Sequence, residues 1–159
     1  MNEPFTTFFE WVEASAVSMR IRESIWLYPF IEIMHIFGIV LVAGGAVFFD
    51  LQLLLSKHLI EKSAYRLLTW SKRGLLIAIP SGLLLFITNA ADLSAVPVFG
   101  LKLSLLVLAA ANAWIFHIRV YLPYRQNQSS FKWNTARTNA VFSIMLWMSI
   151  IACGRLLAY

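Results

Sequence analysis

Four long apolar segments, separated by more polar connections, dominate the chain. They cover about residues 26–54, 74–91, 99–122 and 138–158. A hydrocarbon core of about 30 Å is crossed by about 20 helical residues, so each segment suits one crossing as an α-helix. Short connections make neighbouring helices antiparallel. The pattern predicts an all-α fold: a polytopic membrane four-helix bundle that forms one integral-membrane domain over residues 1–159.

A shorter amphipathic pattern precedes the first span. Between Pro4 and about Met19, apolar residues recur at i, i+3 and i+4, and Glu10 and Glu13 lie elsewhere on the helical wheel. This spacing predicts a short amphipathic helix on the membrane surface. An ordinary packed N-terminal helix is the alternative, and both interpretations keep this segment outside the bilayer core.

Composition supports a membrane protein and excludes several other classes. The chain is 60% hydrophobic and only 13% charged, with a mean hydropathy of +0.72, which no soluble domain of this length matches. The net charge of +5 does not point to nucleic acid, because the basic residues cluster in two connections, 56–73 and 123–137. Positive residues favour the cytoplasmic side. We expect a multi-pass protein of the bacterial inner membrane with both termini on the periplasmic side.

Ionisable groups interrupt the first apolar segment. One helical face carries polar groups at both ends and small or modest side chains between them: Glu32, His35, Gly38, Val42, Ala46 and Asp50. Ionisable groups inside a bilayer are costly and usually turn inward. We expect Asp50, near the helix end, to form an anchoring ion pair with Arg73 or Arg119.

A helical rise of about 1.5 Å per residue gives the depth of each polar group below the outer interface. Four groups from three helices share the outer half of the bilayer: Lys102 at ~5 Å, Arg155 at ~6 Å, Glu32 at ~9 Å and His35 at ~13 Å. His117 lies at ~27 Å, close to Asp50. The depth difference of ~14 Å between His35 and His117 counts against a haem with both as axial ligands in one chain.

The outer cluster matches the needs of haem b. A neutral imidazole binds the iron, and cations bind the two propionates nearer to water. His35 is then the axial ligand, with Lys102 and Arg155 shallower and Glu32 one turn above to orient a base or to pair with Arg155. Met148 lies on the Arg155 face at a depth close to that of His35.

Simpler interpretations exist for the same residues. His35 and Glu32 can form a structural hydrogen-bonded pair, and an ion pair of Glu32 with Arg155 or Lys102 can fix helix register. Lys102 and Arg155 are shallow enough to snorkel to the interface without a cofactor. Met148 can be ordinary packing. The amides of Asn112 and Asn139 are typical of interhelical hydrogen bonds.

Three stretches carry a resemblance to known families: MHIFGIVLVAGGAVFFDLQLL, VFGLKLSLLVLAAANAWIFH and the terminal CGRLLAY. They resemble a family of small four-span bacterial membrane proteins of unassigned function. More distantly, the first two resemble the haem-b protoporphyrinogen oxidase family and the copper-resistance D membrane proteins. The oxidase resemblance implies a haem-linked pair at His35 and Lys102. Gly44-Gly45 and Asp50-Leu51 replace the tryptophan and arginine pattern of that family, which counts against the oxidase chemistry more than against the haem.

These observations lead to one functional hypothesis and one rival. We expect a haem b-binding, cytochrome b-like membrane protein that transfers electrons between a membrane quinone and a periplasmic redox partner. The second axial ligand stays open among Lys102, Met148, His117 and a histidine of another chain in a homo-oligomer. The rival is a non-enzymatic, haem-free transport, assembly or anchoring subunit. A copper-related role of that kind would use scattered sulfur and imidazole ligands such as Met34, Met145 and Cys153.

Overall fold

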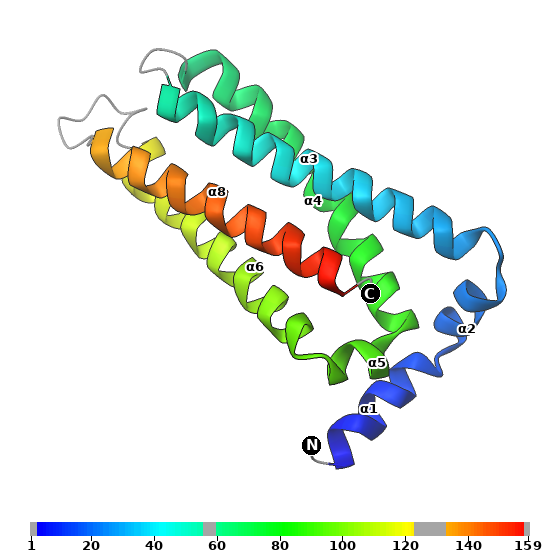
Figure 1. The fold of residues 1–159 in the computed structure, drawn as a ribbon. Helices are drawn as coiled ribbons and strands as arrows, with labels where there is room; N and C mark the ends of the chain where they lie inside the picture. Colours follow the sequence, from blue (N-terminus) through cyan, green and yellow to red (C-terminus); the bar gives the residue numbers. More distant parts are fainter. Residues whose placement is uncertain (1–2, 56–59, 123–132, 158–159) are drawn as a thin grey trace.

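The computed structural model describes residues 3–55, 60–122 and 133–157, and this part of the chain is helical without any strand. Its long helices are α3 (Leu27–Leu55), α4 (Ile60–Thr88), α6 (Pro97–Phe116) and α8 (Trp133–Leu156). A π-helical turn, η1 (His117–Tyr121), continues α6. Each long helix contains a stretch that is long and apolar enough to cross a membrane. The all-α, four-span membrane bundle is therefore confirmed (Figure 1).

Three short helices lie beside the bundle: α1 (Glu3–Glu13), α2 (Ala16–Glu23) and α5 (Ala90–Ala95). The expected single helix over residues 4–19 is divided at Ser15, whose hydroxyl accepts a hydrogen bond from the Ser18 amide at 3.4 Å and caps α2. In α1, Trp11 is 72% exposed, whereas the Phe9 ring packs edge-on against Phe86 of α4. The short N-terminal helix is thus amphipathic, with one face on the bundle.

The second span differs most from its expected bounds. The second span was expected to begin at about residue 74, but residues 60–73 of the first basic connection join it in one continuous helix, α4, of which Thr69–Thr88 is apolar enough to cross a membrane. Lysine, arginine and leucine are good helix formers, so the loss of hydrophobicity along this stretch does not end the helix. The fourth span also begins earlier, at Trp133 rather than Thr138. Residues 123–132 of the second basic connection lie outside the described ranges.

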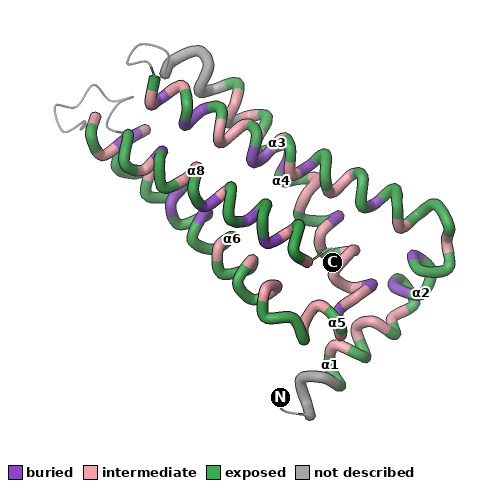
Figure 2. Tube along the Cα trace, viewed as in Figure 1, coloured by how far each residue is buried: buried purple, intermediate pink, exposed green. Residues whose placement is uncertain are grey.

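The helices pack in the order α4, α3, α8, α6. The most extensive contact joins α3 to α4, and α8 packs against both α3 and α6. Close approach of α3 and α4 depends on Gly38, because a Cβ atom there would lie 2.7 Å from the amide nitrogen of Ala78. Figure 2 shows buried positions recurring along α3 and α8, flanked by exposed ones. Among the described residues no comparable packing joins α4 to α6, so the bundle is more open on that side.

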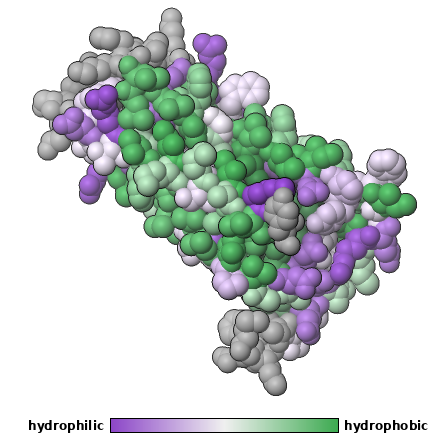
Figure 3. Space-filling view, in the orientation of Figure 1, coloured by the Kyte–Doolittle hydropathy of each residue, from purple (hydrophilic) through white to green (hydrophobic). Residues whose placement is uncertain are grey.

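Hydrogen bonds mark the two ends of the bundle. At one end, called here the α5 end, the side-chain amide of Asn89, the N-cap residue of α5, donates to the Tyr28 hydroxyl of α3 at 3.4 Å. At the other, called the basic end, the Arg137 guanidinium of α8 donates to the Leu54 carbonyl of α3 at 3.0 Å. Between the ends the visible face is largely hydrophobic (Figure 3). Such a surface suits a lipid solvent.

Candidate functional site

His35 lies between α3 and α4 with its ring fixed by α4. Its Nδ1 atom lies 3.0 Å from the backbone oxygen of Ala78 and 3.1 Å from the hydroxyl of Ser81. A carbonyl oxygen can only accept, so the hydrogen-bond network assigns the proton to Nδ1. In the neutral ring the lone pair is then on Nε2. Metal-ligating histidines commonly have this arrangement, with the second nitrogen donating to a carbonyl.

The local sequence of α4 prepares this contact. Pro80 lies inside α4 and has no amide hydrogen, so the Leu76 carbonyl one turn earlier has no helical donor. The Ser81 hydroxyl donates to the Ile77 carbonyl at 2.6 Å, and the His35 ring serves the Ala78 carbonyl. Gly82 provides space for the ring, since a Cβ atom there would lie 2.7 Å from His35 Cε1. The sequence Pro-Ser-Gly thus forms a seat for one imidazole.

Lys102 of α6 reaches the same region from the opposite side of the bundle. Its side chain is partly buried, its charge acts on the His35 ring, and its ammonium nitrogen lies 3.6 Å from where a Gly154 Cβ would be. The structure therefore brings His35 and Lys102 together across three helices, next to the last turns of α8. This agrees with the depth estimate from the sequence, which put both residues in the outer half of the bilayer.

The remaining residues of the outer cluster are exposed. Glu32 and Arg155 are both exposed, and Glu32 forms no ion pair with any residue in the described ranges. Met148 is 59% exposed, so its thioether faces away from the bundle interior and from His35. Exposed side chains here meet lipid or interface, where Arg155 can snorkel to water.

His117 is far from His35. It lies in the π-helical turn after α6, where its ring stacks on Tyr121 with ring centroids 5.4 Å apart. It lines a cavity together with Asp50, which is fifteen residues beyond His35 on α3 and so ~22 Å along the helix axis. No group of three or more His, Cys, Asp or Glu side chains within the described ranges is placed to hold a metal ion. Among the candidate second ligands, only Lys102 of the same chain approaches His35.

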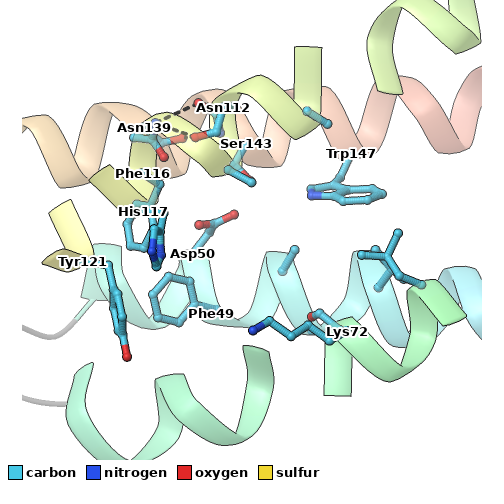
Figure 4. A pocket seen from close by; sticks show the side chains of 17 residues that line it. Phe49, Asp50, Lys72, Asn112, Phe116, His117, Tyr121, Asn139, Ser143 and Trp147 are labelled. Carbon is cyan, nitrogen blue, oxygen red and sulfur yellow. Dashed lines mark hydrogen bonds between the residues drawn. The ribbon is translucent and has the colours of Figure 1, made fainter. Parts of the chain in front are cut away.

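A cavity of about 270 Å³ lies between the helices toward the basic end (Figure 4). Asp50 of α3 is 5% exposed and lines it. Ser143 of α8 lines the cavity beside the carboxyl group, and the Oδ2 atom of Asp50 is buried with no hydrogen-bond partner. The expected anchoring ion pair of Asp50 is therefore wrong. Arg73 instead lies over the Trp70 ring, 5.5 Å from its centroid.

Sequence reasoning missed this cavity although two signals pointed to it. Gly45 and Ala46 lie one turn before Asp50 and leave space beside the carboxylate, and the depth estimate already put His117 at the level of Asp50. The sequence could not supply the rotation of each helix about its own axis. The structure turns both groups toward the same space.

Comparisons with known proteins do not add a relative: no family model, no curated protein and no solved structure matches the chain. Function is therefore inferred from the positions and chemistry of the chain's own residues.

Proposed function

We propose that this protein is a haem b-binding integral membrane protein that transfers electrons between a membrane quinone and a redox partner. The observation that carries the proposal is the fixed ring of His35, whose Nδ1 donates to the Ala78 carbonyl and leaves Nε2 available for a metal. A histidine with a purely structural role needs only a hydrogen bond of this kind. A haem-binding histidine needs, in addition, a positive group nearby that can pair with the haem propionates. Lys102 supplies that group.

The residues divide into two roles. His35 is the axial ligand, and Lys102 and Arg155 are the cations for the propionates, because the helical rise puts both nearer to the outer interface than His35. If Lys102 is instead the second ligand, Arg155 alone serves the propionates. A histidine from a second copy of the chain is the third option for the iron. Haem b, when bound, supplies one-electron transfer, and its potential depends on axial ligand and burial.

The proposal includes an orientation. The basic end carries the larger share of lysine and arginine, and positive residues next to spans favour the cytoplasm. We therefore propose the bacterial inner membrane, with the basic end in the cytoplasm and both termini on the periplasmic side. His35 and Lys102 then lie in the periplasmic half, where the iron is nearer to a periplasmic partner than to the cytoplasm.

A reduced-minus-oxidised absorption spectrum of the detergent-purified protein tests the haem. We expect a Soret and an α band in the wild-type protein and in His117→Ala, and loss of both in His35→Ala while that variant still inserts into the membrane. Full haem content in His35→Ala would overturn the assignment of His35. Absence of haem from wild-type protein expressed with ample haem would overturn the function itself.

The haem-free rival, a transport, assembly or anchoring subunit with a copper-related role, has less support. A copper path needs sulfur and imidazole ligands that converge. Met145 and Met148 are 62% and 59% exposed, so both thioethers face outward from α8. Cys153 is buried close to the Lys102 ammonium, and this positive charge disfavours a copper ion at the same place.

A further inference from the structure

The cavity at the basic end contains a polar group that the chain itself leaves unsatisfied. The Oδ2 atom of Asp50 is buried without a hydrogen-bond partner. A buried acceptor of this kind costs free energy unless something binds it. Figure 4 shows the carboxylate pointing from α3 into the space below α6 and α8, rather than toward the α3 backbone. The cavity is thus built around one open acceptor.

Polar and apolar groups lie at opposite ends of the cavity. Asp50, His117 and Tyr121 lie at the basic end. Val42 and Trp147 line the part toward the middle of the bundle, and Val42 is eight residues before Asp50, or ~12 Å along α3. A ligand with a hydrogen-bonding head and an apolar remainder matches this division. A volume of about 270 Å³ is at the small end of ligand sites and suits a single substituted ring.

The cavity is reached from the lipid. It is lined by α4 residues such as Lys72 and Leu75 and by α6 residues such as Ala113, and these two helices are the pair that lacks extensive packing within the described ranges. A ligand dissolved in the bilayer can enter between α4 and α6 without crossing the bundle. The π-helical turn η1 directs His117 and Tyr121 to the cavity edge, and such turns are frequent at functional sites.

We infer that this cavity binds the ring of a membrane hydroquinone, with one ring hydroxyl donating to Asp50 Oδ2. The inference rests on the proposed electron-transfer function, for which it names the site of the quinone. A hydroquinone is neutral, so it is compatible with the Lys72 ammonium at the same cavity, whereas an organic cation bound to Asp50 would be repelled by that charge. His117 lies beside Asp50 at the same end of the cavity (Figure 4), where its ring can hydrogen-bond a polar group of the ligand.

Asp50 also suits the oxidised form of the same ring. As a carboxylate it accepts from a hydroxyl, and as a carboxylic acid it donates to a quinone carbonyl. Aromatic side chains of Phe49, Phe116 and Trp147 surround the space and can pack against the ring face. A hydroquinone ring thus uses the open acceptor, the apolar part and the access from lipid together.

Calorimetric titration with trimethylhydroquinone under argon, on detergent-purified full-length protein, tests the inference. We expect saturable binding to the wild-type protein and no binding of the doubly O-methylated analogue, which has the same ring but no donor. Asp50→Asn should weaken binding by about 10- to 100-fold, because a charged hydrogen bond is lost. Asp92→Asn, an exposed carboxylate on α5, is the matched control and should bind normally.

A second pair of variants tests the same cavity independently, in case Asp50→Asn does not fold. Ala46→Phe fills the cavity and should abolish binding, whereas Ala110→Phe, on an exposed position of α6, should not. Equal binding of the hydroquinone and its methylated analogue would overturn the inference, as would unchanged affinity in both Asp50→Asn and Ala46→Phe. Preferential binding of benzyltrimethylammonium would assign the cavity to organic cations instead.

The haem spectrum of each preparation separates this inference from the proposed function. Haem without hydroquinone binding would overturn the site and leave electron transfer in place. Hydroquinone binding that depends on Asp50 in a protein without haem would keep the site and remove the electron-transfer role.

Discussion

The Nδ1 atom of His35 lies 3.0 Å from the backbone oxygen of Ala78, forty-three residues later in the chain. This one contact joins the first two spans, fixes the tautomer of the ring and leaves Nε2 as the only nitrogen able to bind iron. It also explains the glycine at position 82 of α4, where any side chain would meet the His35 ring.

Gly82→Ala should displace the His35 ring. The new Cβ atom would lie 2.7 Å from Cε1, and overpacking of this kind costs about 1–3 kcal/mol unless the neighbour moves. The ring is held on one side by Ala78 and cannot move freely away from the new methyl group. We therefore expect a lower ratio of haem to protein and a shifted Soret band. Gly100→Ala, where a Cβ atom meets nothing within 4 Å, is the control. An unchanged spectrum in Gly82→Ala would contradict the position of the haem.

Arg155→Gln should weaken haem binding by about 10- to 100-fold, since each charge-assisted hydrogen bond to a propionate contributes about 1.5–3 kcal/mol. Glu32 is exposed and unpaired within the described ranges, so adding Glu32→Gln should not restore the loss. Haem retention and thermal stability of both single variants and the double variant would be measured. Recovery of stability in the double variant with unchanged haem content would assign the two residues to an ion pair.

Asn112 and Asn139 should show measurable energetic coupling. The Asn139 amide donates to the Asn112 side-chain oxygen at 2.8 Å across α6 and α8, which confirms the interhelical role expected from the sequence (Figure 4). Interhelical hydrogen bonds in membranes average about 0.6 kcal/mol, up to about 1.7. A double-mutant cycle with leucine at both positions should give a coupling in this range by equilibrium unfolding.

A second cycle supplies the control for the asparagine pair. Ser104 and Ser149 are exposed on the same two helices, and each hydroxyl donates to its own helix, at Gly100 and Met145. Their coupling should be zero within error. A coupling for the asparagines no larger than that for the serines would show that the amide pair does not hold α6 to α8.

The orientation can be tested by cysteine labelling in intact cells. In a Cys153→Ala background, Ser94→Cys on α5 should react with a membrane-impermeant maleimide, whereas Ser130→Cys in the second basic connection should react only after lysis. The physical reason is the excess of lysine and arginine at the basic end. Strong labelling from outside at position 130, with none at position 94, would reverse the proposed orientation.

The sequence by itself determined the four membrane spans and the approximate depth of the polar groups along them. Runs of about 20 apolar residues have few structural options in lipid, where backbone groups must be satisfied within the segment. Depth follows from the helical rise alone. For this reason the four spans, the position of His35 and Lys102 in the same half of the bilayer and the separation of His117 from His35 were all predictable.

Only the tertiary structure decided which way each helix faces. A helix that is apolar on every side can be rotated about its axis at little cost in hydrophobic burial, so hydropathy does not fix its inner face. Rotation was set by close contacts such as Gly38 against Ala78. Met148 was thereby turned outward, and Asp50 was turned into a cavity with one oxygen unpaired. Side-chain partners across helices depend on these contacts, which no single segment of the sequence contains.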